Sequence, residues 1–266
     1  MSENILLLSF IGHVLGDYYL QSDKTAHGKN ERFSKLLYHA GIYTLPFVLL
    51  FLIFGMSYRL GVYFLLICAV HFIIDLIKFI IYKSGLFRIS SKKYRAKEFL
   101  VYAIDQSLHI VSILLISIYF KIPASQIQIA PFIKDFLKAI KLDMILALKW
   151  ILLLLCIYKP TNVTFVKAFS NYKPDTKEDS SNIVPSRNVA INKKAGAIIG
   201  LLERVLIVIF INIQQYSAIG LILTAKSIAR YDSISKSQDF AEYYLIGTLT
   251  SLLSAILFYV AIFARL

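Results

Sequence analysis

Long apolar runs separated by short polar connections dominate the pattern of this 266-residue chain. A helix needs about 20 mostly apolar residues to cross a bilayer. The runs that reach or approach this length predict about eight membrane-spanning helices, with a range of seven to nine. They are residues 4–20, 36–56, 60–82, 98–120, 143–158, 195–213, 216–230 and 241–264. The first, fifth and seventh are short enough to be re-entrant or interfacial instead.

The composition indicates an all-α, polytopic membrane protein. The chain is 58% hydrophobic and 17% charged, and its mean hydropathy is +0.66. Soluble domains average about 45–50% apolar and about 25% charged residues. The first helix has no basic segment before it and no small-residue cleavage site, so we expect it to be retained. Cys68 and Cys156 lie in apolar runs without CxxC spacing, which predicts packing residues.

Positive charge is concentrated in three alternate connections, residues 21–35, 83–97 and 159–194, in a chain of net charge +13. Lys and Arg accumulate in the cytoplasmic loops of membrane proteins. These connections are therefore predicted to be cytoplasmic, which puts the N-terminus outside. We expect them to contact anionic lipid headgroups. Nucleic-acid binding is not expected, because no interleaved aromatic or structural motif supports it.

The connections divide the chain into four predicted parts. Residues 1–120 form a four-helix membrane unit, and residues 121–158 hold an outer amphipathic segment, KDFLKAIK, and the fifth helix. Residues 159–194 are rich in Lys, Asn, Ser, Pro and Asp, which is typical of a cytoplasmic linker. Residues 195–266 form a three-helix C-terminal membrane unit. The pattern carries no signal for the oligomeric state.

Polar and ionisable residues interrupt the first four helices at a regular spacing. His13, Asp17 and Gln21 are four residues apart, and on a helix such a series stays on one face, drifting by about 40° per step. The spacing HxxxD recurs in HFIIDLIK, and its reverse occurs in DQSLH. The predicted topology puts seven residues at a similar depth near the cytoplasmic side: His13, Asp17, His39, His71, Asp75, Asp105 and His109.

These seven side chains need partners, because an ionisable group in lipid costs on the order of 3 kcal/mol. Imidazole and carboxylate together suit a divalent metal of the Zn, Mn or Fe type, and the set is large enough for one or two ions. Gln21 and Gln106 are candidates for orienting the carboxylates. Two other interpretations stay open: histidines that hydrogen-bond between helices, and a proton-handling site.

A second polar set lies in the C-terminal helices, also toward the predicted cytoplasmic side. Its members are Glu203, Arg204, Lys226, Arg230 and Glu242. In one interpretation, Glu203, Arg204 and Glu242 form structural ion pairs between helices. The side chains of Lys226 and Arg230 then extend to the membrane surface. In the other, Lys226 and Arg230 share a helix face and bind a phosphate or carboxylate group.

Several of these segments also carry a family resemblance. They are HVLGDYYLQSD at 13–23, HFIIDLIK at 71–78 and DQSLH at 105–109, with GAIIGLLER, AKSIAR and EYYLIGTL in the C-terminal half. In these segments the sequence resembles a bacterial integral-membrane family known as the domain of unknown function 3307. The resemblance implies a multi-pass helical protein of the bacterial cytoplasmic (inner) membrane. It implies no activity, so function has to be argued from the residues.

The leading hypothesis is a metal-dependent membrane hydrolase or phosphoryl-transfer enzyme acting on an amphiphilic or phosphate-bearing substrate. A bound metal would activate water, and Asp17, Asp75 or Asp105 would be the catalytic general base. One alternative is a transporter or channel for protons or divalent cations. Another is a non-catalytic membrane subunit that docks a cytosolic protein partner through its basic loops. HExxH, closely spaced triple-His and GxSxG signatures are absent, which removes those specific enzyme classes.

Overall fold

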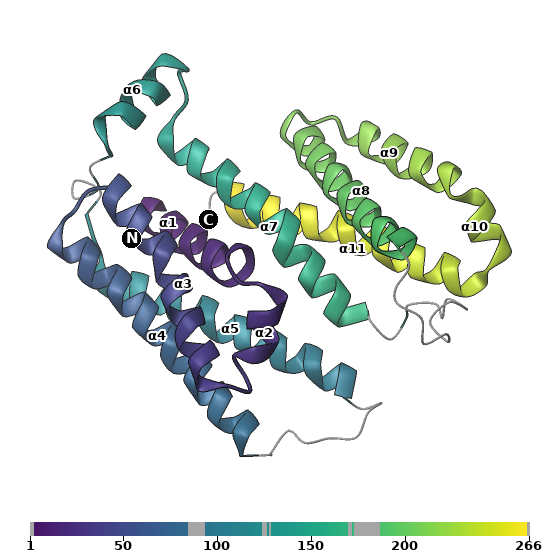
Figure 1. Cartoon of the computed structure of the whole chain (residues 1–266). Helices are drawn as coiled ribbons and strands as arrows, with labels where there is room; N and C mark the ends of the chain where they lie inside the picture. The colour runs from purple at the N-terminus through teal and green to yellow at the C-terminus, as the bar shows by residue number, and fades with distance from the viewer. Residues whose placement is uncertain are drawn as a thin grey trace. The chain divides into compact units, whose positions relative to one another are not determined.

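The computed structural model describes residues 3–84, 94–123, 127, 129–169, 172 and 187–264 (Figure 1). Within these ranges the regular structure is helical, and no strand is present. The chain divides into two compact units, Met1–Leu155 and Cys156–Leu266. Residues 85–93 of the basic connection predicted at 83–97, and residues 170–171 and 173–186 of the predicted linker, lie outside the described ranges.

The first unit is built around four packed helical segments. Its elements are α1 (Glu3–Val14), the π-helix η1 (Leu15–Tyr19), α2 (Asp23–Gly28), α3 (Phe33–Ile53), α4 (Tyr58–Lys83), α5 (Tyr94–Phe120), α6 (Pro131–Ala139) and the start of α7 (Met144–Phe169). Helix α1 packs against α3 and α5, η1 packs against α3, and α4 packs against both α3 and α5. This packing directs the polar stretches of four segments toward one another.

The second unit contains the rest of α7 and four further helices. They are α8 (Arg187–Asn212), α9 (Tyr216–Ala229), α10 (Tyr231–Lys236) and α11 (Gln238–Phe263). Helix α8 packs against α9 and α11, and α10 packs against α11. The Ser237 side chain begins α11 by accepting a hydrogen bond from the Phe240 amide, as Ser does at many helix N-termini.

Five described helices are long and apolar enough to cross a membrane. They are Phe33–Ile53, Tyr58–Lys83, Glu98–Phe120, Met144–Phe169 and Gln238–Phe263. Residues 4–20, 195–213 and 216–230 also lie in helical segments but do not belong to this set, so the predicted count of about eight is not confirmed. Exposed apolar side chains such as Leu65 and Leu115 lie on α4 and α5, as expected of helices that contact lipid. The outside N-terminus stays a prediction.

The predicted fifth helix, 143–158, continues to Phe169, so the described start of the predicted linker is helical. Pro160 lies inside this helix, where it cannot donate to the Cys156 carbonyl. The Thr161 hydroxyl donates to that oxygen instead, at 2.9 Å. Arg204 Nε donates to the next carbonyl, that of Ile157. Because side chains satisfy these carbonyls, the helix passes the proline without ending.

The short helix α6 contains most of the predicted amphipathic segment KDFLKAIK. Phe132, Phe136 and Ile140 recur every four residues there and are 73%, 61% and 50% exposed. A short helix with such an apolar face is typical of segments that lie along a membrane surface. The Ala130 amide donates to the Ile53 carbonyl at 2.9 Å, which holds the start of α6 at the end of α3. The outer location of this segment stays a prediction.

Two glycines let the first helical segment lie close to α3. An ideal Cβ at Gly12 would come within 2.7 Å of the Phe47 ring. At Gly16 it would come within 2.7 Å of the Tyr43 ring and 3.2 Å of the Tyr43 Cα. Because the contact at Gly16 involves the backbone of Tyr43 as well as its ring, rotation of the Tyr43 side chain cannot relieve it.

Gly16→Ala is therefore expected to lower the free energy of unfolding by about 1–3 kcal/mol, the usual cost of overpacking. Gly41→Ala is the matched control, since Gly41 lies on α3 with nothing within 4 Å of its ideal Cβ. The control is expected to be neutral or stabilising, because Ala favours a helix over Gly by about 1 kcal/mol. Thermal unfolding of both variants in detergent measures the difference, and equal midpoints would contradict it.

Candidate metal centre

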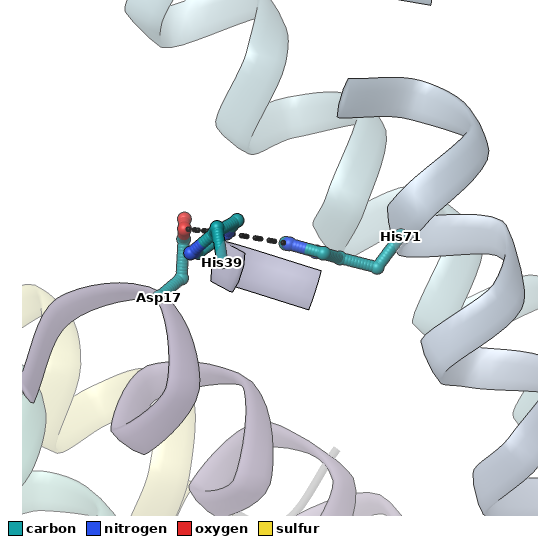
Figure 2. Close-up of side chains that lie close together, drawn as sticks. All are labelled: Asp17, His39 and His71. Atoms are coloured by element: carbon teal, nitrogen blue, oxygen red, sulfur yellow. Dashed lines mark hydrogen bonds and ion pairs between the residues drawn. The ribbon is translucent and has the colours of Figure 1, made fainter. Parts of the chain in front are cut away.

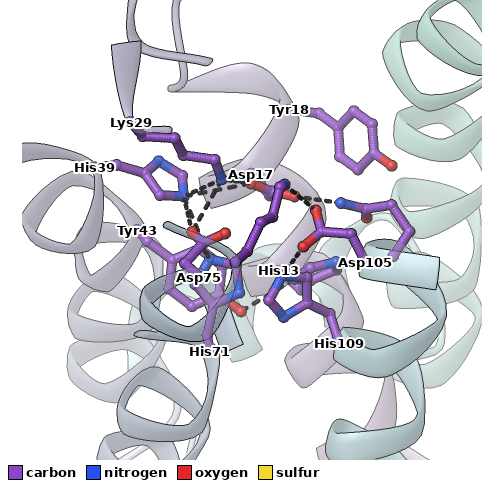
Figure 3. A network of polar contacts seen from close by, with 12 residues as sticks. His13, Asp17, Tyr18, Lys29, His39, Tyr43, His71, Asp75, Asp105 and His109 are labelled. Carbon is purple, nitrogen blue, oxygen red and sulfur yellow. Dashed lines mark hydrogen bonds and ion pairs between the residues drawn. The ribbon is translucent and has the colours of Figure 1, made fainter. Parts of the chain in front are cut away.

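The structure brings together the seven polar residues that the sequence places at one depth (Figure 3). All are buried, with exposed fractions between 0% for His39 and 7% for Asp17. They come from α1, η1, α3, α4 and α5, so their proximity depends on the packing of the whole first unit. The members of this His/Asp cluster are His13, Asp17, His39, His71, Asp75, Asp105 and His109.

The π-helix η1 sets the direction of Asp17. The sequence predicts one regular stripe of His13, Asp17 and Gln21, and this is wrong, because the helix changes to π geometry at Leu15 and ends at Tyr19. His13 Nδ1 contacts the Tyr43 hydroxyl at 3.1 Å, whereas Asp17 Oδ1 lies 3.4 Å from His39 Nε2. Short π-helices often occur at functional sites.

Two of the predicted i, i+4 pairs form within their own helices. His71 Nε2 lies 3.5 Å from Asp75 Oδ2 on α4, and His109 Nε2 lies 3.7 Å from Asp105 Oδ1 on α5. The rings are also stacked. The Tyr43 and His71 centroids are 3.5 Å apart, and the His71 and His109 centroids are 4.1 Å apart. This column of three rings restricts the rotation of both imidazoles.

Lys29 and Lys78 contact the carboxylates of the His/Asp cluster, and neither contact is predicted from the sequence. Lys29 Nζ lies 2.9 Å from Asp75 Oδ2 and 3.5 Å from Asp17 Oδ1. Lys78 Nζ lies 2.7 Å from Asp105 Oδ2. Lys78 follows Asp75 by three residues in HFIIDLIK, so the spacing could have predicted that it lies on the polar face of α4. Lys29 has no comparable signal, because it is one of several lysines in a loop whose positive charge is already explained by a cytoplasmic location.

The glutamines are placed differently from one another. Gln106 Nε2 donates to Asp17 Oδ2 at 2.7 Å, which is the orienting contact proposed for it. Gln21 lies beyond the end of η1, and its buried Oε1 has no hydrogen-bond partner among the described residues. Of the two, Gln106 is therefore the one that orients a cluster carboxylate.

Two overlapping groups in the cluster have the composition of a metal site. One is Asp17, His39 and His71 (Figure 2), and the other is His71, Asp75 and His109. In each group the three candidate ligand atoms lie within 4.8 Å of one another. Each group offers two imidazoles and one carboxylate, a set found in catalytic zinc and non-haem iron sites.

The polar set in the second unit is arranged as contacts between helices. Lys226 Nζ lies 2.5 Å from Glu203 Oε2 and also contacts the Thr248 hydroxyl. Arg204 donates to the Ile157 carbonyl, to Asn162 Oδ1 and, at 3.4 Å, to Ser251 Oγ. These contacts favour structural ion pairs. The predicted anion site has less support, because Lys226 pairs with the Glu203 carboxylate and Arg230 is exposed at the end of α9.

Glu242, the remaining member of that set, stands apart from the other two predicted ion-pair residues. It is exposed and accepts a hydrogen bond from Gln238 Nε2 within α11, at 3.0 Å. This contact is local to one helix, so it does not join α11 to its neighbours.

Comparison with known families gives a match over the part of the chain that carries the cluster. A family model described as protein of unknown function (DUF3307) matches residues 5–137, half of the chain. The chain belongs to this family. No curated protein and no solved structure matches it.

The DUF3307 match ends before α7 and includes every member of the His/Asp cluster, together with Lys29 and Lys78. The C-terminal segments GAIIGLLER, AKSIAR and EYYLIGTL lie beyond it. The cluster thus lies in the DUF3307 part of the chain, and the second unit lies beyond the matched residues.

Proposed function

We propose that the protein is a membrane-embedded, metal-dependent enzyme whose ion is held by His71, Asp75 and His109. One observation carries the proposal: each of these residues keeps a buried ligand atom without a hydrogen-bond partner among the described residues. The atoms are His71 Nδ1, Asp75 Oδ1, and both ring nitrogens of His109. Buried polar atoms are nearly always paired, so several unpaired metal-ligand atoms together favour an ion.

Three protein ligands leave a coordination position for water, as in catalytic zinc sites. A divalent ion bound in this way would supply a Lewis acid and bring the pKa of a bound water to about 7. The reaction that fits is hydrolysis or phosphoryl transfer at an ester of an amphiphilic or phosphate-bearing substrate. In hydrolysis the water oxygen bonds to the reacting phosphorus or carbon, and the ester oxygen leaves.

His13 is better placed than the three aspartates to carry the proton in this reaction. Its ring centroid lies 5.6 Å from that of His109 and 5.8 Å from that of His71. When Nδ1 donates to the Tyr43 oxygen, Nε2 presents a lone pair, and Nε2 has no partner among the described residues. His13 would accept the proton from water and return it to the leaving oxygen. The aspartates instead contact Lys29, Lys78 or Gln106.

Transport of protons or divalent cations is the second candidate, and one observation favours it. The hydroxyls of Ser9, Tyr63 and Ser117 form a buried chain with two contacts of 2.7 Å. Ser9 precedes His13 by one helical turn, so polar groups continue beyond the cluster. The buried residues Ile67 and Ile113 lie between the two levels on α4 and α5, which favours a fixed centre over a continuous path. Ion flux in proteoliposomes separates the two functions.

The bacterial cytoplasmic membrane is the proposed location, with the cluster near the cytoplasmic face. The positive-inside pattern of the loops supports this orientation. Anionic lipid headgroups at the basic loops, and a cytosolic protein partner, belong to the same proposal.

The purified protein is expected to carry a stoichiometric divalent ion, and His71→Ala and His109→Ala are expected to lose it. Elemental mass spectrometry of the desalted protein measures the ion and identifies it. Ser117→Ala is the matched control, since Ser117 is buried on α5 like His109 but lies outside the cluster. Metal-free wild-type protein that remains fully folded after incubation with Zn²⁺, Mn²⁺ or Fe²⁺ would refute the proposal.

A further inference from the structure

Lys29 occupies an unusual position for a lysine of a connecting segment. Its exposed fraction is 4%, and its ammonium lies among three side chains of the cluster. Nζ is 2.9 Å from Asp75 Oδ2, 3.1 Å from His39 Nε2 and 3.5 Å from Asp17 Oδ1. An ammonium has three donors and no acceptor, and the carboxylates of Asp75 and Asp17 each accept a hydrogen bond from it.

The short helix α2 places this side chain. Ser22 begins α2 by accepting a hydrogen bond from the Thr25 amide, and the Lys29 amide ends it by donating to the Thr25 carbonyl. Helix α2 packs against α3, which carries His39. The connection between η1 and α3 is therefore a folded element that directs Lys29 into the cluster.

Two carboxylates pair with the Lys29 ammonium. Its Nζ lies 2.9 Å from Asp75 Oδ2 and 3.5 Å from Asp17 Oδ1. A buried charge is costly unless it is paired in this way, so the fold is built to hold a cation at this position.

The two groups with metal-site composition differ at their carboxylates. Both oxygens of Asp17 in the first group have partners, Oδ1 with Lys29 and Oδ2 with Gln106. In the second group, Asp75 contacts Lys29 through Oδ2, but its Oδ1 has no partner among the described residues. The histidines of both groups each keep a ring nitrogen without a partner among the described residues.

We infer that the cluster is a two-cation site in which Lys29 takes the place of the second metal ion. This inference rests on the proposed function, because it assigns the divalent ion to His71, Asp75 and His109. Two-metal enzymes hold their ions about 3.5–4 Å apart, and the second ion stabilises the charge that develops during the reaction. In this protein a fixed ammonium beside Asp75 supplies that second charge.

The test is the number of ions that the full-length protein binds in detergent. Wild-type protein incubated with Zn²⁺ and desalted is expected to retain one ion per chain, and Lys29→Met is expected to retain two. The variant removes the ammonium and leaves the oxygen and nitrogen ligands of Asp17, His39 and His71 available. Lys24→Met is the matched control, since Lys24 is an exposed lysine of the same helix, and it is expected to retain one ion.

A second pair of variants tests the same assignment if Lys29→Met does not fold. His39→Gln changes a residue that is not a ligand of the proposed ion and is expected to retain one ion, whereas His109→Gln is expected to retain none. Two ions in the wild type, one ion in folded Lys29→Met, or loss of the ion in folded His39→Gln would each overturn the inference while the metal centre stands. No ion in the folded wild type would overturn the proposed function itself.

Discussion

Asp75→Ala is expected to lower the free energy of unfolding by about 3–5 kcal/mol, the usual cost of removing one partner from a buried ion pair. Its carboxylate lies 2.9 Å from Lys29 Nζ, 3.2 Å from His39 Nε2 and 3.5 Å from His71 Nε2. Removal leaves the ammonium of Lys29 buried with Asp17 as its remaining carboxylate contact. Part of the loss is expected to return in the double variant with Lys29→Met, because the unpaired charge is then absent.

Denaturation in detergent with a chelator present measures this effect, since the chelator removes any contribution from metal binding. Asp135→Ala is the matched control, because Asp135 is exposed on α6. The double variant completes a cycle that isolates the coupling between Asp75 and Lys29. Additive losses in that cycle would show that the 2.9 Å contact is not a stabilising pair.

Arg204→Leu is expected to have the largest effect in the second unit, a loss of about 3 kcal/mol or more. Arg204 is 4% exposed, and its guanidinium donates to the Ile157 carbonyl and to Asn162 Oδ1. Leucine would remove both hydrogen bonds, and a hydrogen bond from a charged group contributes about 1.5–3 kcal/mol. The loss should appear as easier opening of α7 near Pro160, where the guanidinium contacts the Ile157 carbonyl.

Hydrogen exchange followed by mass spectrometry can resolve that local opening, alongside thermal unfolding of the whole protein. Arg230→Leu is the matched control, since Arg230 is exposed at the end of α9. It removes the same charge from the same unit. Unchanged exchange of residues 156–162 in Arg204→Leu would contradict the role assigned to the guanidinium.

The helices and the polar residues of the His/Asp cluster could be predicted because both follow from periodicity. Most residues of each of the eight apolar runs are helical, since a long apolar segment satisfies its backbone hydrogen bonds in lipid by forming a helix. His71 and Asp75 fall on one face of α4 by spacing alone. Buried ionisable groups need polar partners, so the seven residues were expected to lie together. That requirement does not predict which of them contact one another.

The sequence could not predict the role of Lys29, because that role depends on tertiary folding of a connection. A lysine near a membrane helix is explained equally well by loop topology, and nothing in its neighbours indicates that α2 turns it inward. The end of the fifth helix was also missed. Pro160 is a helix-breaking signal, and its effect is cancelled by Thr161 and by Arg204 from α8, a distant part of the sequence.

The π-helix η1 affects how this chain should be aligned with its family. A π-helix corresponds to an α-helix with one residue inserted, and one residue of an α-helix turns the chain by about 100°. The segment HxxxD at His13 and the segment HxxxD at His71 therefore have equal spacing and different geometry. A relative with one residue fewer at 15–19 would direct a different side chain toward Lys29. Alignments that allow a single-residue gap at η1 would match Asp17 to its spatial equivalent, whereas ungapped motif searches would not.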